Sequence, residues 1–278
     1  MNSNLRGKVS EPSLPDYSAL LQKGPRSRPL AKKILGLLLK DGKTLHGLFT
    51  KSTLKLLFPN VPEDKLKNLK SKVNSNVSLL ERYNFIERVG RGSIKLKYRT
   101  PLCFIANTPK IPFAYIGLLG QRKYSVSETQ TAIELLESDP NVGIKPEKVV
   151  VVTSQEMVGE WKNAINPRIK ISWETPSEEE LNDIDKVEEL IRPIIVELMR
   201  DYILIMDLTS GPRPAGIAFY ELAVQFKVPL IYVYEPKKRL RWLISKEKLE
   251  KEIGGIFCIQ PGEKGPPVTK IRKRPAIY

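Results

Sequence analysis

The sequence predicts an α/β protein in which a mostly parallel β-sheet follows a small α+β domain. Three observations support this prediction. Beyond residue 112, Val/Ile-rich runs such as KVVVVTS and YILIMD alternate with helical patterns, which is typical of a parallel sheet covered on both faces. Residues 28–106 show three helical patterns and then a basic hairpin pattern. Charge divides at the same place: residues 1–110 hold 22 Lys/Arg against 7 Asp/Glu, whereas residues 111–278 hold 24 of each.

Composition is that of an ordinary soluble protein, with 41% hydrophobic and 28% charged residues in a chain of 278. No run of about 18 apolar residues is present, and the first residues lack the apolar segment of a secretory signal, so we expect no membrane partner and a cytoplasmic location. Cys103 and Cys258 lie too far apart for a metal or redox motif and are expected to be buried thiols. We therefore expect no metal and no cofactor.

The basic N-terminal part is expected to begin with a flexible arm, residues 1–27, because Pro and Gly interrupt it without periodicity. Helices are predicted over RPLAKKILGLLLKDGK, KSTLKLLF and PEDKLKNLKSKVNSNVSLLERY, and two strands over FIERVGRGSIKLKYR. The third helix carries one apolar stripe of Leu66, Leu69, Val73, Val77 and Leu80 opposite a face of lysines and asparagines. Three helices followed by a hairpin indicate a winged helix-turn-helix domain over residues 28–106.

We expect this domain to bind DNA. Its lysines would neutralise phosphates, which makes affinity steeply dependent on salt, while its asparagines would contact base edges. The alternative is a winged helix that serves only dimerisation or packing. The expected DNA contacts are Lys65, Lys67, Lys70, Lys72, Asn74, Arg91, Lys95 and Lys97.

The C-terminal part is predicted to be a Rossmann-like domain over residues 113–260, joined by a linker at 107–112 and followed by a basic tail at 261–278. Its strands are FAYIGLLG, KVVVVTS, IKISW, YILIMD and PLIYVY, with RLRWLI as an antiparallel edge. A helix over SVSETQTAIELLES is expected to begin with a capping box of Ser125 and Glu128.

The stretch DLTSGPR, residues 207–213, follows a buried strand and precedes a helix, where open parallel sheets bind ligands. Backbone amides, a helix N-terminus and an arginine at such a turn favour a phosphate-bearing ligand. GxGxxG after the first strand and GxxxxGK[ST] are absent, which disfavours dinucleotide and Walker-type sites. Alternatively, Asp207 and Thr209 only cap the turn and Arg213 is merely solvated. The expected ligand-binding residues are Gly120, Gln121, Arg122, Ser125, Asp207, Thr209, Ser210, Gly211 and Arg213.

Asp207, Thr209 and Arg213 match the signature [DN]-x-[ST]-x-x-x-[KR] of CARF domains, the CRISPR-associated Rossmann folds, which residues 113–245 resemble. As in that family, the motif follows the fourth strand of the domain. The resemblance implies a homodimer that senses cyclic oligoadenylate, with cyclic tetra-adenylate the expected ring. A winged helix before the CARF part departs from the familiar archaeal regulators, which carry it after.

Two functions follow from this resemblance. The first is a transcriptional regulator whose DNA binding is controlled by the ring. The second is a metal-independent ring nuclease in which a ribose 2′-OH attacks the neighbouring phosphate. There Arg213 would stabilise charge and Ser125 or Gln121 would orient the ribose. A module that makes only protein contacts is the third possibility.

Overall fold

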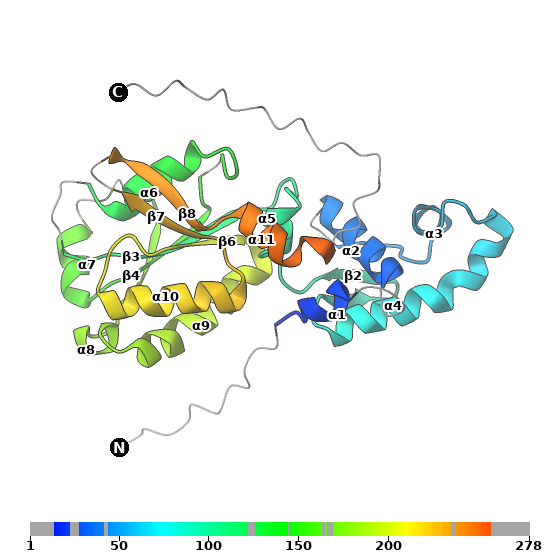
Figure 1. The fold of residues 1–278 in the computed structure, drawn as a ribbon, viewed down its shortest axis with the longest axis horizontal. Coiled ribbons are helices and arrows are strands. Elements are labelled where there is room, and N and C mark those ends of the chain that lie inside the picture. The colour runs from blue at the N-terminus through cyan, green and yellow to red at the C-terminus, as the bar shows by residue number, and fades with distance from the viewer. Residues whose placement is uncertain are drawn as a thin grey trace, which may run out of the picture.

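The computed structural model describes residues 14–22, 28–41, 44–121, 126–143, 145–162, 165, 169–234 and 237–256 (Figure 1). Most of the predicted arm, the basic tail, Cys258, Arg122 and Ser125 lie outside these residues. Within them, none of the helices has both the length and the apolar character needed to cross a membrane.

The C-terminal part is built on a six-stranded sheet with the order β5-β4-β3-β6-β7-β8, as predicted for a mostly parallel Rossmann-like sheet. Five strands are parallel, and β8 pairs antiparallel with β7 at the edge. The chain starts in the centre at β3, runs outward to β5 and returns beside β3 as β6, so the strand order reverses between β3 and β6. The strands are β3 Phe113–Leu118, β4 Lys148–Val152, β5 Ile171–Glu174, β6 Ile203–Asp207, β7 Leu230–Tyr234 and β8 Arg239–Ile244.

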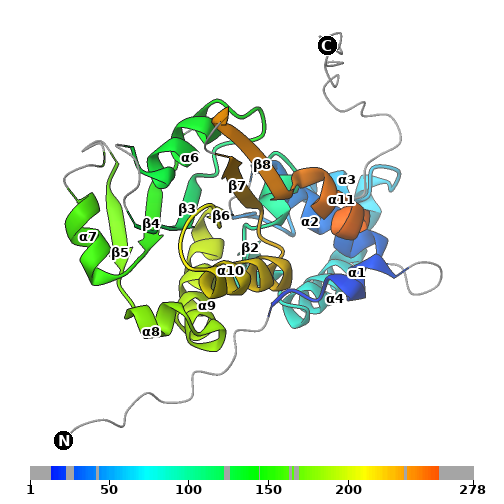
Figure 2. The ribbon, with the colours of Figure 1, turned by 60° about the vertical axis from the view of Figure 1, so that its left-hand side comes forward.

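Helices cover both faces of this sheet (Figures 1 and 2). On one face α9 and α10 pack against each other, and on the other α6 contacts β7 and β8. The amphipathic sequence of α9 explains its place, because its buried side chains are apolar and most of its exposed side chains are charged. The helices are α6 Glu128–Glu137, α7 Gln155–Trp161, α8 Glu178–Leu181, α9 Ile184–Asp201 and α10 Arg213–Phe226.

Two helix starts differ from the sequence prediction. Helix α6 is capped by Ser127, whose side chain accepts from the Gln130 amide at 3.1 Å, so the expected capping box of Ser125 and Glu128 is wrong. The stretch SEEELNDIDKVEELIRPIIVELMRD, residues 177–201, has the pattern of one helix but forms two, because Asp183 caps a new start with its side chain. In both places a second capping residue lies a few positions along, and periodicity alone does not say which one the chain uses.

The N-terminal part has the predicted order of helices followed by a hairpin. The third predicted helix begins as a 3-10 helix and continues as an α-helix. Its apolar stripe is buried at Leu66, Val73, Val77 and Leu80. Residues Ile94, Leu96 and Tyr98 point into the core, as their alternation predicts. The elements are α2 Pro29–Asp41, α3 Lys51–Leu57, η2 Glu63–Leu69, α4 Lys70–Arg82, β1 Ile86–Gly90, β2 Ser93–Leu96 and α5 Leu102–Ile105.

A short helix, α1 Tyr17–Leu21, lies within the segment predicted as an arm. Asp16 caps it by accepting from the Ala19 amide at 3.2 Å, and Leu20 is completely buried. Five residues are too few for a periodic signal, so this helix is held by packing rather than by propensity.

The two parts share one hydrophobic core cluster. The segment between them is packed: Thr108 is buried and donates its hydroxyl to the Leu39 carbonyl at 2.8 Å, and Ile111 is 3% exposed. After β8 the chain returns to the N-terminal part, where α11 Lys246–Ile253 contacts α5, and the following η4 Gly254–Ile256 contacts α1. The predicted domain boundaries stay a prediction.

Candidate functional site

A polar hollow of about 610 Å³ lies beyond the carboxyl ends of β3, β4 and β6, beside the point where the strand order reverses. This is where open α/β sheets place their ligands, and the volume falls within the range of small-molecule pockets, about 300–1,000 Å³. The described lining residues are Leu119, Gly120, Gln121, Glu128, Thr153, Ser154, Met157, Glu178, Leu181, Asn182, Thr209, Ser210, Gly211, Pro212 and Tyr232.

The turn after β6 is held from beneath by Asp207, whose side chain is completely buried. One carboxylate oxygen accepts the Thr209 amide at 2.8 Å and also the Thr209 hydroxyl. The other accepts the Tyr115 hydroxyl at 2.7 Å. The Thr209 hydroxyl in turn accepts from the Val233 amide on β7 at 2.8 Å. The turn is therefore tied to both neighbouring strands, β3 and β7.

The reach of Tyr115 to Asp207 depends on a glycine. In the register of β3 with β6, Gly117 lies opposite Asp207 and Tyr115 lies two residues back on the same face of the sheet. A Cβ on Gly117 would lie 2.3 Å from the Tyr115 hydroxyl oxygen. The missing side chain thus makes the space through which the tyrosine crosses diagonally to the carboxylate.

Burial dominates the electrostatics of this carboxylate. It raises the pKa of Asp207 to about 6, although the hydrogen bonds from Thr209 and Tyr115 act in the opposite direction. Burial, and then the charge of Asp207, raise the pKa of Tyr115 well above its usual value, so the tyrosine stays a hydrogen-bond donor. The pair is a structural lock beneath the hollow.

The loop after β3 forms the facing wall and is fixed by three side chains. The Gly120 amide donates to the Ser210 hydroxyl at 3.0 Å, and the Gly120 carbonyl accepts from the Trp161 indole at 2.9 Å. Thr153, just beyond β4, donates its hydroxyl to the Leu119 carbonyl at 2.7 Å. The loops after β3, β4 and β6 are thereby joined into one rim.

Glycine is required at the tip of the β6 turn. Gly211 has φ +90°, and a Cβ there would lie 2.9 Å from the Leu118 side chain. Helix α10 then starts at Arg213, capped by the backbone of Pro212 and by no side chain, and Gly216 makes the first helical bond at 3.1 Å. Because Pro212 and Pro214 have no N–H, the amides of Arg213 and Ala215 are the earlier ones without an intrahelical acceptor, and such free amides can bind an anion.

The structure brings together Gly120, Gln121, Thr209, Ser210 and Gly211 of the predicted ligand residues. Asp207 lies under the turn, where its carboxylate accepts from Thr209, and it does not line the hollow. Its expected part in ligand binding stays a prediction. Arg213 is exposed at the start of α10 and is also not a lining residue. Arg122 and Ser125 lie outside the described residues.

The described lining is not basic. It includes the carboxylates of Glu128 and Glu178 and, within the described part of the chain, no lysine or arginine. Nor do the described residues contain a group of three or more His, Cys, Asp or Glu side chains able to hold a metal ion. Binding of an anion at this wall would rest on amides and hydroxyls.

Several contributors to the site were not predicted from the sequence. Tyr115, Thr153 and Trp161 reach the rim only through strand pairing and helix packing. A usable signal existed for Thr153, because it comes at the end of the apolar run in the predicted strand KVVVVTS, much as Thr209 comes two residues after the end of YILIMD.

The predicted DNA-contacting residues gather on η2, α4 and the hairpin. Lys65, Lys67, Lys70, Lys72 and Arg91 are exposed, and Lys95 and Lys97 are half-buried. Lys95 pairs with Glu87 at 2.7 Å, and Lys97 donates to the Asn84 amide oxygen at 2.8 Å. Asn74 accepts from Arg88 at 3.3 Å, so this amide is engaged with the hairpin as well as exposed.

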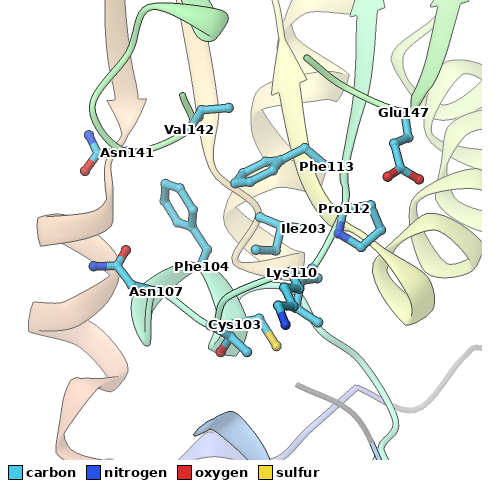
Figure 3. A pocket seen from close by; sticks show the side chains of 12 residues that line it. Cys103, Phe104, Asn107, Lys110, Pro112, Phe113, Asn141, Val142, Glu147 and Ile203 are labelled. Carbon is cyan, nitrogen blue, oxygen red and sulfur yellow. The ribbon is translucent and has the colours of Figure 1, made fainter. Parts of the chain in front are cut away.

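A second hollow, of about 390 Å³, lies at the opposite ends of β3 and β6 (Figure 3). Phe104 and Phe113 point toward each other there, but they are only 2% and 6% exposed and offer little open ring surface. Cys103 also lines it, and burial raises the pKa of this thiol to about 11, which agrees with the predicted buried thiol. This hollow lies at the amino ends of the strands, away from the β6 turn.

Neither the family models nor the curated proteins contain a match to this chain. Among solved structures, the chain is similar to protein VC1899 from Vibrio cholerae, with 12% identity and a TM-score of 0.35, over 48% of this chain and 34% of that one. It is also similar to Enterococcus italicus Csm6 bound to cyclic hexa-2′-fluoro-hexa-dAMP, with 14% identity and a TM-score of 0.35, over 52% of this chain and 37% of that one. The chain thus spans about a third of the length of these proteins.

Proposed function

We propose that the chain is a CARF-type sensor of cyclic oligoadenylate that acts as a homodimeric, ligand-controlled DNA-binding regulator. The observation that carries this is the place of the DLTSGPR turn: it forms one wall of a polar hollow at the reversal of strand order. A turn locked to both neighbouring strands is a rigid cradle, which a binding site needs in order to avoid the free-energy cost of ordering.

The phosphates of the ring would be held by the free amides at the start of α10 and by the hydroxyl of Ser210, which accepts from the Gly120 amide and keeps its own proton to donate. The Thr209 hydroxyl already donates to Asp207. Arg213, exposed beside that turn, would supply the charge that the described lining lacks. Because Arg213 lies outside the hollow, the ring would extend over its edge rather than fit wholly inside it.

A two-fold ring suits a two-fold dimer. Helix α10 leads away from the hollow and carries an apolar stripe of Ile217, Tyr220 and Val224, which are 47%, 44% and 39% exposed. These residues are spaced as one face of a helix and stay partly exposed in the described part of the chain. A second copy packed along α10 would cover the stripe and bring two hollows together.

Binding of rings tests the sensor directly. Titration calorimetry with cyclic tetra-adenylate, cyclic hexa-adenylate and linear tetra-adenylate should show a preference for a ring, with one ring per two chains. Arg213→Gln should weaken binding, whereas Arg241→Gln, an exposed cation on β8, should not. Absence of binding to any ring by the wild type would refute the proposal.

DNA binding is tested separately by fluorescence anisotropy with duplex DNA at about 50 mM salt, where phosphate contacts are strongest. Saturating ring should change the affinity for DNA, because coupling between two ligands is reciprocal. If the affinity for DNA is the same with and without the ring at every salt concentration, the chain could still be a sensor of the ring, but the proposed regulation of DNA binding would be refuted.

A further inference from the structure

A small polar hollow lies where the basic hairpin meets the end of helix α9. Its volume is about 220 Å³, below the range of pockets for whole small molecules, and it is sized for a single charged group. It joins the N-terminal part to the sheet domain, and neither Arg99 nor Arg200 was among the predicted DNA contacts. The lining residues are Thr44, Glu87, Lys95, Leu96, Lys97, Arg99, Arg200 and Asp201.

The hollow carries an excess of positive charge. Lys95 and Glu87 neutralise each other at 2.7 Å. Lys97 donates to a neutral amide, and Arg99 donates to the Asp201 backbone carbonyl at 2.9 Å. Within the described residues Lys97, Arg99 and Arg200 form no ion pair, and the carboxylate of Asp201 is the one acid left against them. Two positive charges thus remain for an anion to match.

Arg99 is held in place before any ligand arrives, and Arg200 lies beside it. The Arg99 amide donates to the Met199 carbonyl at 2.7 Å, which fastens the end of the hairpin to the last turn of α9. Arg200 lies in that same last turn, where the negative end of the helix dipole stabilises a cation. Guanidinium groups match phosphate oxygens in pairs, so two of them at one hollow favour phosphate over a simple halide.

We propose that this hollow binds a backbone phosphate of duplex DNA, with Arg200 and Arg99 as the phosphate ligands. The hollow is continuous with the expected DNA-binding surface of the hairpin, because Lys95 and Lys97 line the hollow and Arg91 is exposed at the hairpin tip. A single strand of DNA backbone that follows the hairpin would reach α9 and so touch the sheet domain. The inference rests on the proposed DNA binding and adds a contact outside the winged domain.

The test compares two charge-removing variants of the full chain. Arg200→Gln removes the proposed contact, and Lys186→Gln removes an equal charge from the other end of the same helix, about 21 Å away at 1.5 Å per residue. Fluorescence anisotropy with one labelled duplex is measured between about 50 and 200 mM salt. Thermal melts verify that both variants are folded.

Arg200→Gln should weaken DNA binding about threefold to tenfold and lower the slope of log K against log salt by about 1, since one phosphate contact is lost. Lys186→Gln should match the wild type in both. Arg200→Lys keeps the charge at the helix end, so it should fold, keep the slope and lose part of the affinity. This variant keeps the test decisive if the glutamine variant is unstable.

Three results would overturn the inference. If both Arg200 variants bind DNA with the affinity and salt slope of the wild type, the proposed phosphate contact is overturned, and the proposal that the chain binds DNA is not affected. Inorganic phosphate at constant ionic strength could raise the melting temperature of the wild type but not of Arg200→Gln. If Arg200→Gln also bound DNA as the wild type does, the hollow would be assigned to free phosphate. No DNA binding by the wild type would remove this inference and the regulatory proposal together, without bearing on the binding of rings.

Discussion

Replacing Thr209 with valine keeps the shape of the side chain and removes the hydroxyl that ties the β6 turn to its neighbours. That hydroxyl donates to Asp207 and accepts from the Val233 amide at 2.8 Å. Val233 is 1% exposed, so its amide would be left without an acceptor in a buried strand. Asp207 would lose one of three donors in a completely buried site.

The size of the effect follows from these two losses. An unsatisfied buried amide costs about 1–3 kcal/mol, and a hydrogen bond to a charged group contributes about 1.5–3 kcal/mol. Thr209→Val should therefore lower the free energy of unfolding by about 2.5–6 kcal/mol at neutral pH, a large part of the roughly 5–15 kcal/mol of a typical domain. Thr209→Ser keeps the hydroxyl and loses one methyl group, which costs about 1 kcal/mol.

Urea unfolding followed by tryptophan fluorescence measures both variants under the same conditions. The serine variant is the matched control, because it differs from valine in the hydrogen bonds. A valine variant within about 1 kcal/mol of wild type, or a serine variant as unstable as the valine one, would show that the hydroxyl does not hold the turn.

Two further predictions concern the lock beneath the hollow. Gly117→Ala would push a Cβ to within 2.3 Å of the Tyr115 hydroxyl oxygen and should destabilise by about 1–3 kcal/mol, as an overpacked core does. Gly36 lies in α2, and a Cβ there would have no neighbouring atom within 4 Å, so Gly36→Ala should instead stabilise the protein by up to about 1 kcal/mol. Equal stabilities of the two variants in urea unfolding would contradict this geometry. Because the pKa of Asp207 is raised from 3.8 to about 6, the folded state binds more protons in that window, so stability should fall by up to about 3 kcal/mol as pH rises through it. Asp207→Asn should remove most of this slope in urea titrations between pH 4 and 7; an unchanged slope would assign the pH dependence to other groups.

The sheet was predictable because its strands are continuous apolar runs whose lengths and spacing leave few alternatives. YILIMD and KVVVVTS became the buried strands β6 and β4, and RLRWLI became the antiparallel edge. The place of the candidate site was predictable for the same reason, since a Thr/Ser/Gly turn at the end of a buried strand has one location in a parallel sheet.

The support of the site was not predictable, because it depends on partners far away in the sequence. The bond from Tyr115 to Asp207 spans 92 residues and needs the register of β3 against β6. The Trp161 indole reaches Gly120 across 41 residues through the packing of α7. A residue pattern predicts on which face of its own strand or helix a side chain lies. To predict these contacts, one must also know which strand or helix lies next to it and in which register.

Strand β6 links the candidate site to the N-terminal part in a way that gives the proposed regulation a physical route. Its carboxyl end is Asp207, under the turn, and near its amino end the Leu204 amide donates to the Thr100 hydroxyl at 2.7 Å. The same hydroxyl donates to the Tyr202 carbonyl at 2.9 Å, and Thr100 is completely buried just after the hairpin. Strand β6 is five residues long and buried along its whole length, so we expect a shift of the turn to be transmitted to Thr100 and the hairpin behind it. Thr100→Val would break this link without touching the hollow, so rings should still bind while their effect on DNA affinity falls. A variant that keeps full coupling would place the route elsewhere.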